Sequence, residues 1–159
     1  MKRVIALLME NQPGALSRVV GLFSQRGYNI ESLIVAPTED PSLSRLTMTT
    51  KGDTQVVEQI TKQLNKLIDV VKVLDLSLEE YVGRELLLIK MEFSEKAEAE
   101  VSNLGGQVLF KDDNLLNAEF VGTSEELDEI VTFLAKLNPM EVVRTGLSGI
   151  SCTTKTLTI

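Results

Sequence analysis

The spacing of apolar residues in the first half of the chain predicts four strands and two helices. Unbroken apolar runs are typical of strands buried on both faces, and apolar residues three and four apart are typical of one face of a helix. In chain order, strands are predicted over residues 4–9, 30–36, 44–50 and 70–76, with helices over 15–26 and 53–67. Gly27 is expected to close the first helix in a left-handed conformation, and Asp53 is expected to cap the second. The order strand, helix, strand, strand, helix, strand predicts a ferredoxin-like unit with both helices on one face of an antiparallel sheet.

The same order of elements returns in the second half. Strands are predicted over residues 85–93, 107–110, 115–121 and 140–147, with helices over 94–104 and 123–134. Ser94 is expected to cap the first of these helices, and Thr123 with Glu126 matches a capping box at the second. The chain is therefore predicted to be an α+β protein of two tandem ferredoxin-like βαββαβ units, with a period of about 78 residues. The threonine-rich tail over 151–159 gives no structural signal.

The distribution of charge supports a boundary between the two halves. Residues 1–78 carry nine Lys and Arg against eight Asp and Glu, whereas residues 79–159 carry seven against fifteen. We therefore expect a first domain over 1–77, a short linker over 78–83 and a second domain over 84–159.

Composition narrows the classes of function. The chain has 159 residues and a net charge of −7, and aromatic residues make up 4% of it. Nucleic-acid binders normally carry a basic face, and RNA-binding modules of this fold need stacking aromatic residues on their central strands. We therefore expect no nucleic-acid binding. Because no apolar stretch approaches about 20 residues, we also expect no membrane span.

The sequence offers little for catalysis or metal binding. It has no histidine, the commonest general base and a frequent metal ligand, and no Gly-rich phosphate loop with a lysine. We predict no catalytic residue and no metal site. The single cysteine, Cys152, cannot form an internal disulfide, which fits a reducing, cytoplasmic setting.

The stretch from Glu10 to Val35 has the features of a small anion-binding site. Asn11 offers a side-chain acceptor to the first N–H groups of the predicted helix, and Gly14 keeps the helix entrance free of a side chain. Backbone N–H groups and the helix dipole attract a carboxylate at such an entrance. No nucleophile or general base accompanies them, so the site would hold a ligand without transforming it. Taken alone, the stretch is explained slightly better as a capped helix with no ligand.

A longer motif carries a family resemblance. The run ENQPGALSRVVGLFSQRGYNIESLIVAPTEDPSLSRLTMTT, residues 10–50, strongly resembles the small, regulatory subunit of acetohydroxyacid synthase, also called acetolactate synthase. The resemblance is close over residues 1–75. It is looser from residue 84 onward, where RELLLIKM and VVRTGLSGI resemble the C-terminal domain of the family.

The resemblance implies a binding site shared by two chains. The first unit would be an ACT domain, a module that senses amino acids, and two such domains would pair sheet edge to sheet edge in a homodimer. Valine or a related branched-chain amino acid would bind at that interface. The effector-contacting positions of the family correspond to Asn11, Gly14, Ala15 and Leu16 of one protomer and to Asn29 and Ile30 of the other.

The resemblance also implies a catalytic partner. The dimer would bind the catalytic large subunit of acetohydroxyacid synthase, raise its activity, and confer feedback inhibition by valine in branched-chain amino acid biosynthesis. This chain would be non-catalytic and hold no cofactor. Thiamine diphosphate, Mg and FAD would belong to the catalytic subunit, whose holoenzyme is a transferase. The resemblance does not fix the contact surface. Arg18, Arg26 and Arg45 are exposed candidates for it, although surface arginines are more often only solvated.

Two other classes of function stay open at this point. One is a self-contained amino-acid-responsive protein without an enzyme partner, which co-purification with a large thiamine-diphosphate enzyme would distinguish. The other is a small enzyme of the same fold, such as an acyl-phosphate hydrolase. Such an enzyme would need an arginine and an asparagine around a phosphate loop, and the sequence shows no such arrangement.

Overall fold

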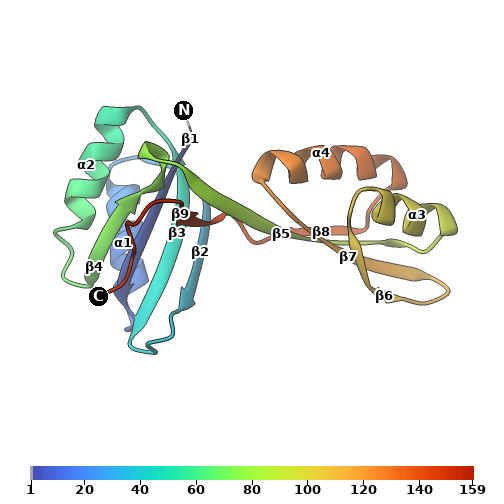
Figure 1. Ribbon diagram of the computed structural model, residues 1–159, viewed down its shortest axis with the longest axis horizontal. Coiled ribbons are helices and arrows are strands. Elements are labelled where there is room, and N and C mark those ends of the chain that lie inside the picture. Colours follow the sequence, from blue (N-terminus) through green and yellow to red (C-terminus); the bar gives the residue numbers. More distant parts are fainter. Residues whose placement is uncertain (1) are drawn as a thin grey trace. The chain divides into compact units, whose positions relative to one another are not determined.

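The computed structural model describes residues 2–159, which form two compact units. The first unit comprises residues 2–82 together with 147–159, and the second comprises residues 83–146. Both follow the order βαββαβ, so the predicted α+β fold of two ferredoxin-like units is confirmed (Figure 1). Residues 147–159 were expected in the second domain, and the structure groups them with the first unit instead.

The first unit is an antiparallel sheet with two helices. Its elements are β1 (Lys2–Glu10), α1 (Ala15–Gln25), β2 (Ile30–Pro37), β3 (Leu43–Lys51), α2 (Thr54–Leu64), β4 (Val70–Asp75) and a 3₁₀ turn over Leu76–Leu78. The strand order is β2-β3-β1-β4, so β1 and β3 are central and β2 forms one edge. Helix α2 begins at its predicted cap, because the Asp53 carboxylate accepts a hydrogen bond from the Val56 N–H at 2.9 Å.

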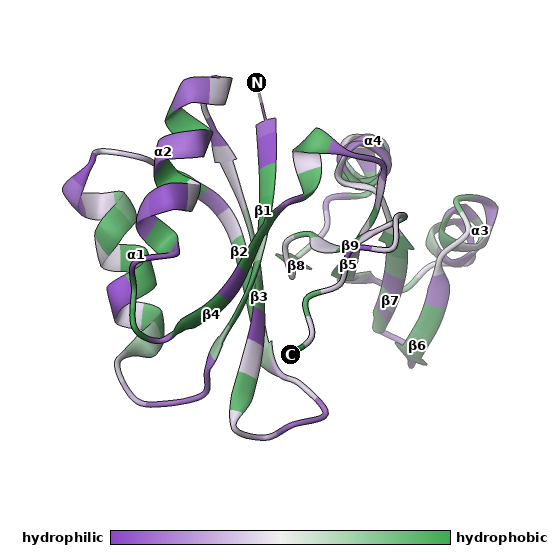
Figure 2. Ribbon diagram, turned by 60° about the vertical axis from the view of Figure 1, so that its left-hand side comes forward, coloured by the Kyte–Doolittle hydropathy of each residue, from purple (hydrophilic) through white to green (hydrophobic). Residues whose placement is uncertain are grey.

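Both faces of this sheet are buried along its two central strands, β1 and β3, whose side chains point alternately to one face and the other. Leu7 on β1 pairs with Leu46 on β3, and both pack with Phe23 of α1 in the main core. Figure 2 shows α1 and α2 together on this side of the sheet. The adjacent pair, Ala6 and Thr47, is also buried and faces the opposite side.

The C-terminal segment covers that opposite face. Strand β9 (Ser148–Ser151) contacts both β1 and β3, and the C-terminus lies on the side away from the helices (Figure 2). The buried cluster on this side comprises Val4, Ala6, Leu76, Leu147 and Leu157. Arg45 Nη2 donates to the Gly149 carbonyl at 2.7 Å, and burial lowers the pKa of Arg45. Arg45, expected to be an exposed contact residue, is thus a partly buried anchor for the tail.

The second unit has the same architecture with its own core. Its elements are β5 (Tyr81–Glu92), α3 (Glu95–Asn103), β6 (Gln107–Lys111), β7 (Leu115–Gly122), α4 (Ser124–Leu134), a 3₁₀ turn over Ala135–Leu137 and β8 (Glu141–Arg144). The strand order is β6-β7-β5-β8, and β9 pairs with β5 off this path. Helices α3 and α4 cover one face of the sheet (Figure 1). The cap at Ser94 and the capping box of Thr123 and Glu126 are both confirmed.

Two predicted boundaries differ from the structure. Strand β5 begins at Tyr81, so part of the expected linker over 78–83 is strand. The strand predicted over 140–147 is two strands, β8 and β9, because Gly146 adopts a φ of 86° between them and turns the chain. Among the helices formed by residues 2–159, none is both long and apolar enough to span a membrane.

Candidate functional site

The amino end of α1 is the candidate site, and its geometry depends on Gly14. Gly14 occupies the N-cap position with a φ of 87°, a left-handed conformation that favours glycine. Within the described chain, no side chain caps this helix and its first turn holds no acidic residue. The N–H groups of Leu16 and Ser17 therefore have no acceptor among residues 2–159. Together with the helix dipole, they can receive an anion.

Asn11 and the N–H group of Ala15 do not contribute to this entrance in the way that was predicted. The Asn11 side chain does not cap the helix, whose N-cap is Gly14, and its Nδ2 donates to the Pro41 carbonyl at 3.0 Å. Its backbone N–H donates to the Ser42 carbonyl at 2.7 Å, which holds Asn11 against the β2–β3 connection. The N–H of Ala15 already donates to the Gln12 carbonyl at 3.2 Å. The free donors are thus displaced by one residue, to Leu16 and the residue that follows.

The guanidinium of Arg18 also lies at this entrance, a position that the sequence pattern did not reveal. Its Nη1 lies 3.0 Å from the point where a Cβ on Gly14 would lie, so the guanidinium lies beside the helix entrance. Its other nitrogens bind the buried carboxylate of Asp69, with Nη2 donating to Oδ1 at 2.6 Å. This ion pair raises the pKa of Arg18 through its hydrogen bonds and holds that of Asp69 below the usual value. The one sequence signal was spacing, since Arg18 lies one helical turn after Gly14.

Asn29 and Ile30 lie at the other end of α1. Eleven helical residues separate Gly14 from the turn that leads to Asn29, which is a length of about 16 Å. Asn29 is exposed, and its carbonyl accepts from Thr50 Oγ1 at 2.7 Å. Ile30 opens the edge strand β2 and is partly buried. A single chain therefore does not bring the two predicted groups of effector residues together.

Side chains that could bind a metal ion are not clustered within residues 2–159, and the one cysteine lies outside the candidate site. Residues 2–159 contain no group of three or more His, Cys, Asp or Glu side chains placed to hold a metal ion. Cys152 is free and exposed in the segment after β9.

Comparison with known proteins assigns the family. Residues 5–72 match the AHAS small subunit-like ACT domain, and residues 84–153 match a family described as the small subunit of acetolactate synthase. The acetolactate synthase isozyme 3 small subunit of Salmonella typhimurium is 48% identical over 159 residues, which cover 95% of this chain and 96% of that protein. The chain belongs to the acetolactate synthase small-subunit family.

Other members of the acetolactate synthase small-subunit family agree in sequence and in structure. The probable small subunit of Methanothermobacter thermautotrophicus is 40% identical, over 97% of this chain and 95% of that protein. The crystal structure of the small subunit from Thermotoga maritima superposes with a TM-score of 0.88 at 31% identity, covering 98% of this chain and 99% of that one. The helix entrance at Gly14 and the edge strand β2 both lie inside the matched ACT domain.

Proposed function

We propose that this chain is the regulatory subunit of acetohydroxyacid synthase. It binds the catalytic large subunit, raises its activity, and makes that activity sensitive to feedback inhibition by valine or a related branched-chain amino acid. Membership of the acetolactate synthase small-subunit family, with an ACT domain over residues 5–72, is the observation that carries this proposal. The chain itself contributes no chemistry to the reaction, and thiamine diphosphate, Mg and FAD are held by the partner.

The effector site is shared between two copies that pair through β2. Strand β2 is one of the two edge strands of the first sheet, so an antiparallel partner strand can extend that sheet. Within one chain, Asn29 lies at the opposite end of α1 from Gly14. Antiparallel pairing reverses the partner strand, so it carries the partner's Asn29 and Ile30 toward the Gly14 end. Pairing of two chains in this way brings together the effector residues that lie apart in a single chain.

Different residues of this shared site bind the carboxylate, the ammonium group and the side chain of the amino acid. The carboxylate binds the free N–H groups at Leu16 and its neighbour, with Nη1 of the Asp69-paired Arg18 beside Gly14 as a further donor. The exposed side chain of Asn29 offers a carbonyl to the ammonium group. The aliphatic side chain rests on Ile30. Regulation requires the effector to favour one arrangement of the two copies, with a coupling of about 1–3 kcal/mol.

A synthase assay tests the proposal. The catalytic large subunit is assayed alone, with this chain, and with this chain plus valine. We expect activation by the chain and reversal of that activation by valine. If the chain leaves the activity unchanged, the proposal is wrong.

Calorimetry with valine tests the site itself. Asn29→Ala is expected to weaken valine binding at least fivefold, whereas Asn103→Ala, at an exposed position at the end of α3, leaves it unchanged. Equal affinities for the two variants would remove Asn29 from the effector site.

A further inference from the structure

Arg45 is a partly buried arginine that has no carboxylate partner within residues 2–159. It pairs across the strands with the buried Leu8, on the face of the first sheet that the tail covers. In the described chain its guanidinium makes one hydrogen bond, from Nη2 to the Gly149 carbonyl at 2.7 Å. Burial lowers the pKa of Arg45, because no nearby negative charge offsets the loss of water. Such a cation is stabilised when an anion binds beside it.

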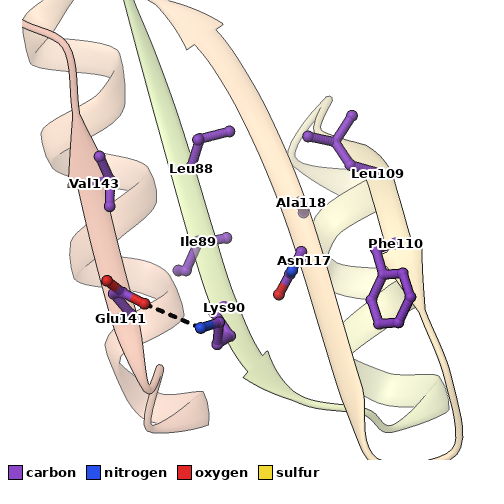
Figure 3. A pocket seen from close by; sticks show the side chains of 9 residues that line it. All are labelled: Leu88, Ile89, Lys90, Leu109, Phe110, Asn117, Ala118, Glu141 and Val143. Carbon is purple, nitrogen blue, oxygen red and sulfur yellow. Dashed lines mark hydrogen bonds and ion pairs between the residues drawn. The ribbon is translucent and has the colours of Figure 1, made fainter.

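Cations in comparable positions of the second unit do have carboxylate partners. Arg144 is also partly buried, and its guanidinium donates to the carboxylates of Glu85 and Asp128. Burial would lower its pKa, but these two carboxylates raise it above the ordinary value. On the sheet face away from α3 and α4, a cavity is lined by Lys90, whose ammonium binds Glu141 at 3.1 Å (Figure 3). Neither cation is left without a counter-ion, in contrast to the one in the first unit.

A cavity of about 310 Å³ opens beside Arg45. Its volume lies within the roughly 300–1,000 Å³ of small-molecule sites. Ile34 and Pro37 of the edge strand β2 give it an apolar lining. Thr47 of β3 and Ser148 of the tail also line it and can supply hydroxyl groups. The cavity therefore combines a positive charge, hydroxyl groups and an apolar surface under one edge of the tail.

Glu39 supplies a negative charge at the same cavity. It lies in the connection from β2 to β3, is exposed, and makes no ion pair within residues 2–159. A second cavity, of about 290 Å³, is also lined by Glu39 and Arg45, together with Leu157 of the tail. The two opposite charges thus line the same space without binding each other. A ligand that carries both a negative and a positive group matches this arrangement.

We infer that the cavity between Arg45, Glu39 and the tail binds a small aliphatic amino acid in its zwitterionic form. The carboxylate pairs with the guanidinium of Arg45, and the ammonium group pairs with Glu39. A dianion such as inorganic phosphate is less suited, because Glu39 repels it. The aliphatic side chain lies against Ile34 and Pro37, with Ser148 at the edge of the ligand. This site lies on the opposite face of the sheet from α1 and does not depend on the effector site at the helix entrance.

Amide hydrogen exchange of the full chain, titrated with L-valine as the probe, tests the inference. Bound ligand should slow exchange in the tail segment 147–151 by about threefold when valine reaches twice its dissociation constant. Peptides from residues 11–30 report the helix entrance in the same experiment, so each site has its own midpoint. Asn29→Ala should raise the midpoint at 11–30 alone. If it shifts both midpoints equally, or if valine up to about 50 mM leaves 147–151 unchanged, the inference is overturned.

Glu39→Gln should give the reverse result. Because Glu39 is exposed and binds no other residue within 2–159, this variant is expected to fold normally. We expect its midpoint at 147–151 to rise by at least about fivefold, with the midpoint at 11–30 unchanged. Glu129→Gln, at an exposed position on α4, is the matched control and should change neither midpoint. Equal midpoints at 147–151 for the two variants would exclude Glu39 from the site and overturn the inference.

A ligand analogue and an arginine variant test the two charged contacts separately. 3-Methylbutanoate is valine without its ammonium group, and it should not slow exchange at 147–151 where valine does. Equal slowing by both compounds would mean that the site accepts any carboxylate, which overturns the assignment to an amino acid. Arg45→Gln keeps a donor for the Gly149 carbonyl but removes the charge. It should abolish the response at 147–151 and keep that at 11–30, and retention of both responses would also overturn the inference.

Discussion

Arg18 and Asp69 join the first turn of α1 to the start of β4. The Arg18 guanidinium donates from Nη2 to Asp69 Oδ1 at 2.6 Å and from Nε to Oδ2, a bidentate pair between residues far apart in the sequence. The Asp69 side chain is 5% exposed, and its backbone carbonyl accepts from the Glu10 N–H at 2.8 Å. Asp69 therefore ties together the end of β1, the entrance of α1 and the start of β4.

Removing the charge of Asp69 should destabilise the first unit. Asp69→Asn leaves Arg18 without its counter-ion and replaces two charge-assisted hydrogen bonds by at most one neutral acceptor. We expect a lower midpoint of thermal unfolding for this variant. The control is Glu58→Gln, which removes an exposed ion pair to Lys62 at 4.0 Å and should leave the midpoint unchanged. Equal midpoints for the two variants would show that the Arg18 pair does not stabilise the fold.

The same ion pair predicts a dependence of stability on pH. The pKa of Asp69 is lower in the folded chain than in the unfolded chain, where it is near 3.9. Its stabilisation is therefore complete above that unfolded value and is lost as the pH falls through the lower folded pKa. We expect the free energy of urea unfolding to fall steeply between about pH 4 and pH 2. Asp69→Asn should show a shallower fall over this range, and an identical pH profile would contradict the assignment.

Substitution by alanine should change the free energy of unfolding in opposite directions at Gly14 and Gly21, the N-cap and an interior residue of α1. Gly14→Ala places a side chain at a φ of 87° and brings its Cβ to 3.0 Å from Arg18 Nη1, so we expect a loss of about 1–2 kcal/mol. Gly21→Ala lies inside α1, with no atom within 4 Å of the added Cβ, and should gain about 0.5–1 kcal/mol. Urea unfolding of both variants measures the difference. Equal stabilities would mean that Gly14 is not held in the left-handed conformation.

The tail should contribute to the stability of the first unit. Leu157 is 5% exposed against Ala6 and Leu76, so Leu157→Ala is expected to cost about 2 kcal/mol. Ile159 is 90% exposed, and Ile159→Ala serves as the control with no expected loss. Amide hydrogen exchange should speed up in β1 for Leu157→Ala alone. If β1 remains equally protected in both variants, the tail does not seal this face.

The elements of this chain were largely readable from local signals. The caps at Asp53, Ser94 and Thr123 lie where the sequence placed them, because each needs only a side-chain acceptor and a nearby N–H group. The left-handed closure after α1 at Gly27 likewise needs only the absence of a Cβ. The order of strands and helices followed from the period of the apolar residues, and it correctly indicated two ferredoxin-like units.

Contacts between distant residues were not readable in this way. The sequence made Asn11 a helix cap, but the Pro41 and Ser42 carbonyls bind it instead. Arg18 and Arg45 were expected to be exposed contact residues. Arg18 is exposed but pairs with Asp69, and Arg45 is partly buried and donates to the Gly149 carbonyl. No local pattern encodes such partners, because the residues involved meet only after the sheet has formed.

The sequence by itself determined the type and order of the elements, the helix caps at Asp53, Ser94 and Thr123, and the motif that indicated the family. Tertiary structure alone decided which strands became the edges of each sheet, which carbonyls accept hydrogen bonds from Asn11, and where the tail packs. The physical reason is the separation along the chain over which each interaction acts. Propensity, capping and apolar period act within about one or two turns of the chain, whereas burial of Leu157 against Ala6 joins opposite ends of it.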